Sequence, residues 1–252
     1  MQVRIEHKSI IGSREEQQDS YYVSTCGDIV FAIVCDGMGG TDGGSAASRT
    51  AVNKLKELIK AKNPVEPLPL FFLRAIDILD ESVVGLKKQF GAEDFGTTIV
   101  AVAVENGFLY WLAVGDSRLY IIRGNEIVQI TRDHNFALSL EQWTAEELQT
   151  AKSLIRNPRA DALISFIGIG GIKIYDINET ALSLFAGDKV LLTTDGLTKV
   201  LANNEILHLL TDNQLSNSLD LLFEKAFVRS NGVQDNTTCV LIQIEDGGTQ
   251  NG

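Results

Sequence analysis

Two apolar runs joined by a tight turn place the strongest limit on what this chain can fold into. Residues 98–104 and 108–114 are rich in β-branched and aromatic side chains, and the Glu-Asn-Gly sequence at 105–107 is a strong hairpin signal. Residues 118–123 and 126–130 are predicted to extend this hairpin into an antiparallel meander. The regular alternation of strands and helices that builds a parallel sheet is missing.

Apolar residues at helical spacing predict two early helices and one late helix. A period of about 3.6 residues runs through 47–59 and 73–86, with three prolines between them, and again through 219–226. Thr144 and Glu147 form a capping box that predicts a shorter helix. Further strands are predicted at 20–24, 29–35, 189–193 and 237–244. The order of these elements indicates antiparallel sheets covered by helices.

The charge and composition exclude several classes of partner. The 252 residues carry a formal net charge of −11, so nucleic acid and anionic lipid are not expected to bind. Residues 1–6 contain no apolar segment of a signal peptide, and no apolar stretch approaches the roughly 20 residues of a membrane span. The three cysteines show no Cys-x-x-Cys spacing, which argues against a disulfide framework and a zinc site. We therefore expect a cytoplasmic location.

Acidic residues recur at the ends of the predicted strands. Five aspartates stand next to apolar runs in this way: Asp19, Asp36, Asp116, Asp195 and Asp235. A single Asp-Gly pair usually makes only a turn. If five strand ends converge, however, their carboxylates repel each other and require cations between them. Carboxylates, backbone carbonyls and water are the ligands of Mg²⁺ or Mn²⁺, and Gly37 would let its own carbonyl approach an ion closely.

The glycines at 37–40 do not make a nucleotide-binding loop. They lack the GxGxxG spacing, and no β-α-β unit surrounds them. The chain also contains no Gly-Lys-Ser or Gly-Lys-Thr sequence, as a Walker loop requires. A cation site is therefore the better interpretation of this segment.

Seven segments in order resemble the motif series of the PP2C-type (PPM) metal-dependent serine/threonine phosphatases, in particular their bacterial branch. These segments are residues 12–19, 36–40, 95–98, 115–120, 131–134, 195–198 and 235–238. The resemblance implies an α+β fold, a four-layer α/β/β/α sandwich in which two antiparallel β-sheets are flanked by helices. It implies one domain over residues 1–244, with a flap-like segment at 136–169 that bears on substrate choice. The sequence EDGGTQNG at 245–252 is expected to be a disordered tail.

The same resemblance implies a binuclear centre of two Mn²⁺ or Mg²⁺ ions. Asp36 would bridge both ions, and the carbonyl of Gly37 would bind one of them. Asp195 and Asp235 would hold the other ion. Two bridged cations lower the pKa of a shared water, so that it can attack phosphorus in line at neutral pH.

Three further roles follow from the resemblance. Asp19 would orient metal-bound waters or join a ligand shell, and Asp116 would support a third, weaker ion. Arg14 would clamp the substrate phosphate, because a guanidinium offers paired donors that match phosphate oxygens. Arg14 and Asp36 are thus the expected catalytic residues. The expected reaction is hydrolysis of phosphoserine and phosphothreonine in proteins by a monomeric enzyme, with a serine/threonine kinase opposing it.

Several positions depart from the family pattern. Met38 stands where many eukaryotic members have a histidine that is a candidate proton donor, and methionine cannot donate a proton. Gln18 replaces a frequent acidic residue, and Lys199 stands where an acidic or amide residue is common. Residues 164–168 replace a segment that usually carries Thr-Arg. None of these changes removes a carboxylate of the predicted metal site.

Two other functions remain open on the sequence. The departures at Gln18 and Lys199 allow a non-catalytic phosphoprotein-binding or regulatory domain on the same fold. A nuclease or phosphodiesterase is disfavoured, because the chain is acidic and has no basic stripe.

For His134, a loop histidine with satisfied hydrogen bonds is favoured over a catalytic role. Asn236 is expected to support the site, and Thr97 and Thr98 to pack and hydrogen-bond near it.

Overall fold

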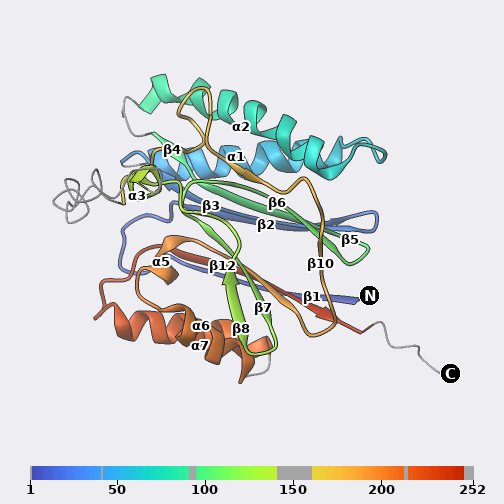
Figure 1. Ribbon diagram of the computed structural model, residues 1–252. Helices are drawn as coiled ribbons and strands as arrows, with labels where there is room; N and C mark the ends of the chain where they lie inside the picture. Colours follow the sequence, from blue (N-terminus) through green and yellow to red (C-terminus); the bar gives the residue numbers. More distant parts are fainter. Residues whose placement is uncertain (1, 41, 91–94, 141–160, 213–214, 247–252) are drawn as a thin grey trace.

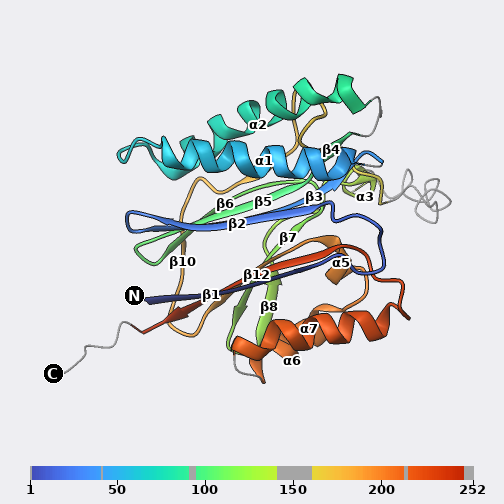
Figure 2. The same ribbon diagram turned by 180° about the vertical axis from the view of Figure 1, so that it is seen from behind.

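Two antiparallel sheets lie face to face between two layers of helices (Figures 1 and 2). This computed structural model describes residues 2–40, 42–90, 95–140, 161–212 and 215–246. The architecture is the predicted α/β/β/α sandwich. Among helices in these ranges, none has the length and apolar character needed to cross a bilayer.

The first sheet is built around the predicted hairpin. Its strands follow the order β10-β6-β5-β3-β2, with β4 paired to β3 and β9 paired to β6. Their bounds are β2 (Asp19–Cys26), β3 (Ile29–Met38), β4 (Gly96–Thr97), β5 (Ile99–Glu105), β6 (Phe108–Val114), β9 (Asp176–Ile177) and β10 (Leu182–Ser183). All of these pairings are antiparallel, as the sequence predicted.

The second sheet follows the order β1-β12-β11-β7-β8. Its strands are β1 (Gln2–Ile10), β7 (Arg118–Arg123), β8 (Glu126–Gln129), β11 (Lys189–Thr193) and β12 (Thr237–Glu245). The predicted single meander is therefore wrong, because β7 pairs with β8 and β11 and not with β6. The chain changes sheets at Gly115, whose φ of +104° turns the backbone, and a Cβ there would lie 2.6 Å from Thr98 Cγ2.

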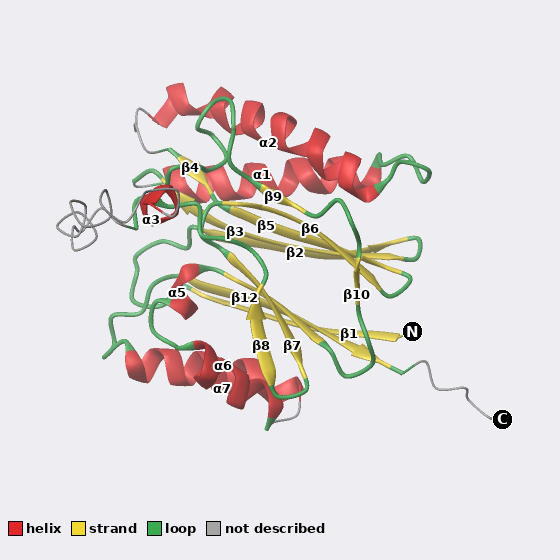
Figure 3. Cartoon of the chain, viewed as in Figure 1, coloured by secondary structure: helices red, strands yellow, loops and turns green. Residues whose placement is uncertain are grey.

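Helices α1 (Gly43–Lys60) and α2 (Leu68–Phe90) cover the first sheet, while α6 (Asn203–Thr211) and α7 (Leu215–Arg229) cover the second (Figure 3). Short helices α3 (Phe136–Leu140) and α5 (Asp195–Thr198) lie in the connections. Helix α2 starts before the predicted residue 73, because Pro69 stands in its first turn, where proline is tolerated. The helix expected at Thr144 lies outside the described residues, as do most of the flap and residues 247–252.

Strand β3 is buried on both faces, which explains its continuous apolar run. Phe31, Ile33 and Cys35 belong to the core beneath α1 and α2, while Ala32 and Val34 face the core between the sheets. A third core lies between the second sheet and helices α5 to α7. The end of β3 therefore enters the gap between two packed layers, and it carries Asp36 there.

Candidate active site

A cleft of about 880 Å³ opens at the end of the sandwich where β3 stops. It brings together six of the seven predicted site residues: Arg14, Asp36, Gly37, Asp116, Asp195 and Asp235. The seventh, Asp19, is only 6% exposed. Residues from both sheets and from the loops between them thus meet around a single space.

Asp19 and Asp36 stand opposite each other in the antiparallel register of β2 and β3. Side chains at directly opposed positions point to the same face of a sheet and lie close together. Thr194 Oγ1 donates a hydrogen bond to Asp19 Oδ2 at 2.9 Å, across from the second sheet. The other oxygen of this carboxylate, Oδ1, is buried and has no hydrogen-bond partner in the described part of the chain.

Three carboxylates of the site have raised pKa values. Burial, reinforced by Asp195 and Asp235, raises the pKa of Asp19 to about 7. Burial together with Asp19 and Asp195 raises the pKa of Asp36 well above its ordinary value. Burial and Asp195 also raise the pKa of Asp116 to about 7, although Lys199 opposes the shift. Burial is the largest cause of each shift, and repulsion between neighbouring carboxylates adds to it. A divalent cation would oppose both effects by favouring the charged forms.

The backbone of Asp36 is fixed by two threonines. Its N–H donates to Thr98 Oγ1 at 2.9 Å, and its carbonyl accepts from Thr98 N and from Thr97 Oγ1, both at 2.8 Å. The Thr98 hydroxyl also shares a hydrogen bond of 2.6 Å with Ser117 in the link to the second sheet. This network fixes the strand end and leaves the Asp36 carboxylate for the cleft.

Gly37 is required by packing between β3 and the start of α1. A Cβ at this position would lie 1.9 Å from the carbonyl oxygen of Gly44. The sequence interpretation attributed this glycine to close approach by an ion. Steric contact with α1 is sufficient to explain it, while the proposed role of its carbonyl stays a prediction.

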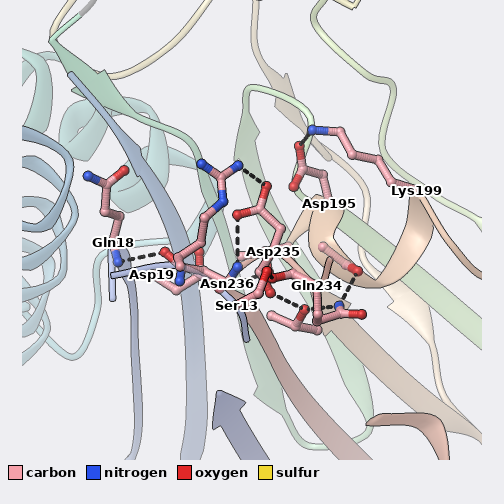
Figure 4. Close-up of polar contacts among 12 residues, drawn as sticks. Ser13, Gln18, Asp19, Asp195, Lys199, Gln234, Asp235 and Asn236 are labelled. Carbon is pink, nitrogen blue, oxygen red and sulfur yellow. Dashed lines mark hydrogen bonds and ion pairs between the residues drawn. The ribbon is translucent and has the colours of Figure 1, made fainter. Parts of the chain in front are cut away.

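Two carboxylates of the cleft are paired with cationic side chains (Figure 4). Arg14 Nη2 donates to Asp235 Oδ2 at 2.7 Å, and Lys199 forms an ion pair with Asp195. In the residues that the structure describes, no three Asp, Glu, His or Cys side chains are gathered closely enough to hold a metal ion. An ion held by these carboxylates would compete with Arg14 for Asp235 Oδ2 and could bind the oxygen of Asp195 that Lys199 does not engage.

A family model described as Protein phosphatase 2C matches residues 8–238. The chain belongs to this family. It is 29% identical to the protein phosphatase PhpP of Streptococcus pneumoniae over 244 residues, which are 92% of this chain and 94% of the relative. It is also 29% identical over 218 residues to the serine/threonine phosphatase stp of Listeria monocytogenes, with 84% of each chain covered.

Solved phosphatase structures share the architecture. The serine/threonine phosphatase of S. agalactiae has a TM-score of 0.82 at 27% identity, covering 97% of this chain and 100% of that one. The catalytic domain of PstP, solved in complex with two manganese ions, has a TM-score of 0.76 at 26% identity, covering 97% and 99%. The predicted fold, bacterial PP2C-type family and enzyme class are confirmed.

Other residues of this phosphatase support the cleft from its edges. Asn236 Oδ1 accepts from Gln18 N at 2.8 Å, and its Nδ2 donates to the carbonyls of Ile11 and Glu16 at 2.8 and 3.0 Å. The loop that carries Arg14 is thus attached to β12, in agreement with the supporting role expected for Asn236. Only the fold shows these partners, because more than 200 residues separate them in the sequence.

His134 lies buried behind the phosphatase cleft. Its Nδ1 accepts a hydrogen bond from Gly115 N at 3.1 Å, and its Nε2 lies 3.5 Å from Asp176 Oδ1. His134 therefore holds the link between the sheets through Nδ1. Its buried Nε2 has no hydrogen-bond partner among the described residues, so the expected loop histidine with satisfied hydrogen bonds is found at one ring nitrogen only.

The sequence analysis missed Glu16 and Asp161 as cleft residues. Glu16 accepts hydrogen bonds from Ser45 Oγ and from Asp42 N, so it joins the loop before β2 to the start of α1. Its position between Arg14 and Asp19 was the available signal. Asp161 gave no such signal, because it lies outside the seven matching segments, although it stands in the predicted flap-like segment at 136–169.

Proposed function

We propose that this phosphatase hydrolyses phosphoserine and phosphothreonine in proteins with two Mn²⁺ or Mg²⁺ ions in the cleft. The observation that carries the proposal is the convergence of Asp36, Asp116, Asp195 and Asp235 on one cleft above the buried Asp19. The named relatives are serine/threonine phosphatases, and PstP was solved with two manganese ions. A kinase that phosphorylates the same proteins would complete the cycle, and a monomer is the expected state.

The residues present fit hard divalent cations. Their donors are carboxylate oxygens, of which those of Asp19 and Asp36 have raised pKa values, and Asp19 Oδ1 is a buried acceptor that lacks a donor among the described residues. Asp36 and the carbonyl of Gly37 would hold one ion, and Asp36, Asp195 and Asp235 the other. When bound, two such ions make water nucleophilic at neutral pH and neutralise charge on the phosphoryl group.

Arg14 would bind and orient the substrate phosphate. Its side chain is 61% exposed, and exposed ion pairs such as the one with Asp235 contribute at most about 1 kcal/mol. The guanidinium can therefore leave Asp235 for a phosphate at little cost. Phosphate oxygens would accept two parallel hydrogen bonds from it, which fixes the orientation of the phosphorus atom.

Among the described residues of the cleft, no side chain is an obvious acid to protonate the leaving group. Met38 lines the cleft at the position where a histidine is frequent, and its thioether has no proton to donate. The leaving alkoxide must therefore obtain its proton from solvent that enters the open cleft or from another group.

Turnover of a phosphothreonine peptide tests the proposal directly. Activity should require Mn²⁺ or Mg²⁺ and disappear with EDTA, and Asp36→Asn should be inactive. Binding of the peptide without turnover, at any metal concentration, would favour the regulatory domain instead. Equal turnover in EDTA and in Mn²⁺ would contradict a metal mechanism altogether.

A further inference from the structure

We propose that the ammonium group of Lys199 is a built-in cation that occupies the position between Asp195 and Asp116, so that the chain binds two metal ions there and not three. The inference rests on the proposed function and concerns the number of ions in its site. It replaces the third, weaker ion that the family resemblance implied near Asp116.

The geometry begins with the short helix α5. Asp195 is its first residue and Lys199 follows its last, so the two side chains stand one helical turn apart on the same side. The backbone N–H of Lys199 donates to the Asp195 carbonyl at 2.8 Å, which fixes the end of this turn. Lys199 Nζ then reaches Asp195 Oδ2, and Figure 4 shows this pair within the site.

Asp116 completes the surroundings of the ammonium. Asp116, Asp195 and Lys199 all line the same cleft. Asp116 and Lys199 also attract each other electrostatically within this space. One positive charge therefore lies in the field of two carboxylates, where the resemblance implied a weakly bound dication.

An ordinary surface ion pair looks different in this molecule. Lys54 and Glu57 form a pair along α1, but the Glu57 side chain is 66% exposed, so water screens its charge. The Asp195 side chain is only 14% exposed, and it repels the other carboxylates of the cleft. A cation beside Asp195 thus reduces the repulsion between Asp195 and the other carboxylates of the cleft. A cation beside the exposed Glu57 has no comparable effect.

The contact also leaves room for the central pair of ions. Lys199 engages Oδ2 of Asp195, so the second oxygen of that carboxylate can face an ion held with Asp36 and Asp235. A dication approaching Asp116 would have to displace an ammonium that is covalently attached to the protein. The effective concentration of the Lys199 ammonium beside Asp195 is high, because only one helical turn of four residues separates the two.

Mn²⁺ stoichiometry of the full chain tests the inference, by equilibrium dialysis and calorimetry. The unmodified chain and Lys199→Arg should bind two ions. Lys199→Gln should bind a third, weaker ion, and the double variant with Asp116→Ala should return to two. Lys54→Gln is the matched control and should bind two. Circular dichroism should verify that every variant is folded.

The outcomes separate this inference from the proposed function. Three ions in the unmodified chain, or two in Lys199→Gln, would overturn the built-in cation and leave the binuclear site intact. No bound Mn²⁺ in any folded variant would overturn the proposed function and this inference with it.

Discussion

Arg14 and Asp235, which both line the cleft, are joined by a hydrogen bond of 2.7 Å between Nη2 and Oδ2. In the proposed function these two side chains have separate partners, phosphate for Arg14 and a metal ion for Asp235. Both roles therefore compete with this contact for the same atoms, Nη2 of Arg14 and Oδ2 of Asp235. Metal binding at Asp235 would release Arg14 for the substrate, which links the loading of the metal site to substrate binding.

Replacing Arg14 should separate catalysis from metal binding. Arg14→Ala should lower kcat/KM by about 10² or more, since a charged and oriented donor to the transition state is lost. Arg14→Lys should recover only part of the loss. Mn²⁺ affinity, measured by calorimetry, should be unchanged or tighter, because Asp235 no longer has a competing cation. Unaltered kinetics in Arg14→Ala would show that Arg14 is an ordinary surface residue without a part in catalysis.

Asparagine substitutions should distinguish metal ligands from turn residues. Asp36→Asn should abolish detectable turnover and weaken both Mn²⁺ sites, because this carboxylate is assigned to both ions. Asp195→Asn and Asp235→Asn should each weaken one site and remove most of the activity. Asparagine serves turns about as well as aspartate does. Wild-type metal binding and turnover in Asp36→Asn would show that the residue only makes a turn.

The stability of the metal-free protein should fall as pH rises. The pKa of Asp19 is about 7 in the folded state against an ordinary value of 3.8, and that of Asp36 is raised as well. Between pH 3.8 and about pH 7, the folded state therefore binds more protons than the unfolded chain. The free energy of unfolding decreases as the pH rises through this range. Carboxylates with a lowered pKa, such as Asp176, finish titrating at lower pH.

Urea unfolding in EDTA at pH 5 and pH 8 measures this effect. We expect lower stability at pH 8, a smaller difference in Asp19→Asn, and recovery of stability at pH 8 when Mn²⁺ is added. A metal-free protein that becomes more stable between these two pH values would contradict the assignment of repelling carboxylates.

Asp80 should anchor the loop in which the flap-like segment ends. This buried carboxylate on α2 accepts backbone hydrogen bonds from Gly168, Gly170 and Gly171 at 2.7, 3.3 and 2.6 Å. Asp80→Asn turns an amide donor toward these N–H groups and should lower the free energy of unfolding by about 2 kcal/mol. Asp77→Asn, on the exposed side of the same helix, should change it little. Denaturant unfolding of both variants in EDTA gives the comparison.

Local signals in the sequence were sufficient for much of the fold. The β5–β6 hairpin, α1 and β3 were predicted because each is defined by neighbouring residues and their spacing. Strand β1 was not predicted, although Val3 and Ile5 alternate with polar residues as in a half-buried strand, because only two apolar residues carry this alternation before the polar run at 6–9. The partner of β7 was assigned wrongly, because periodicity identifies a strand and not the sheet that it joins.

The candidate site could also be predicted only in part from the sequence. The motif series identified the carboxylates, and the four-residue spacing of Asp195 and Lys199 made their contact accessible from the sequence. The pairing of Arg14 with Asp235 was not accessible, because 221 residues separate them and only the fold brings them together. The unpartnered oxygen of Asp19 is likewise a property of packing, which residue types alone do not reveal.

The change of sheet at Gly115 has a mechanical consequence. Asp19 and Asp36 belong to the first sheet, Asp195 and Asp235 flank strands of the second, and Asp116 lies in the link between them. An ion held by these residues is a cross-link between the two halves of the sandwich. Metal binding would then resist sliding of one sheet over the other, and the metal-free protein would begin to separate at this end. The supply of divalent cations would govern the rigidity of the enzyme as well as its chemistry.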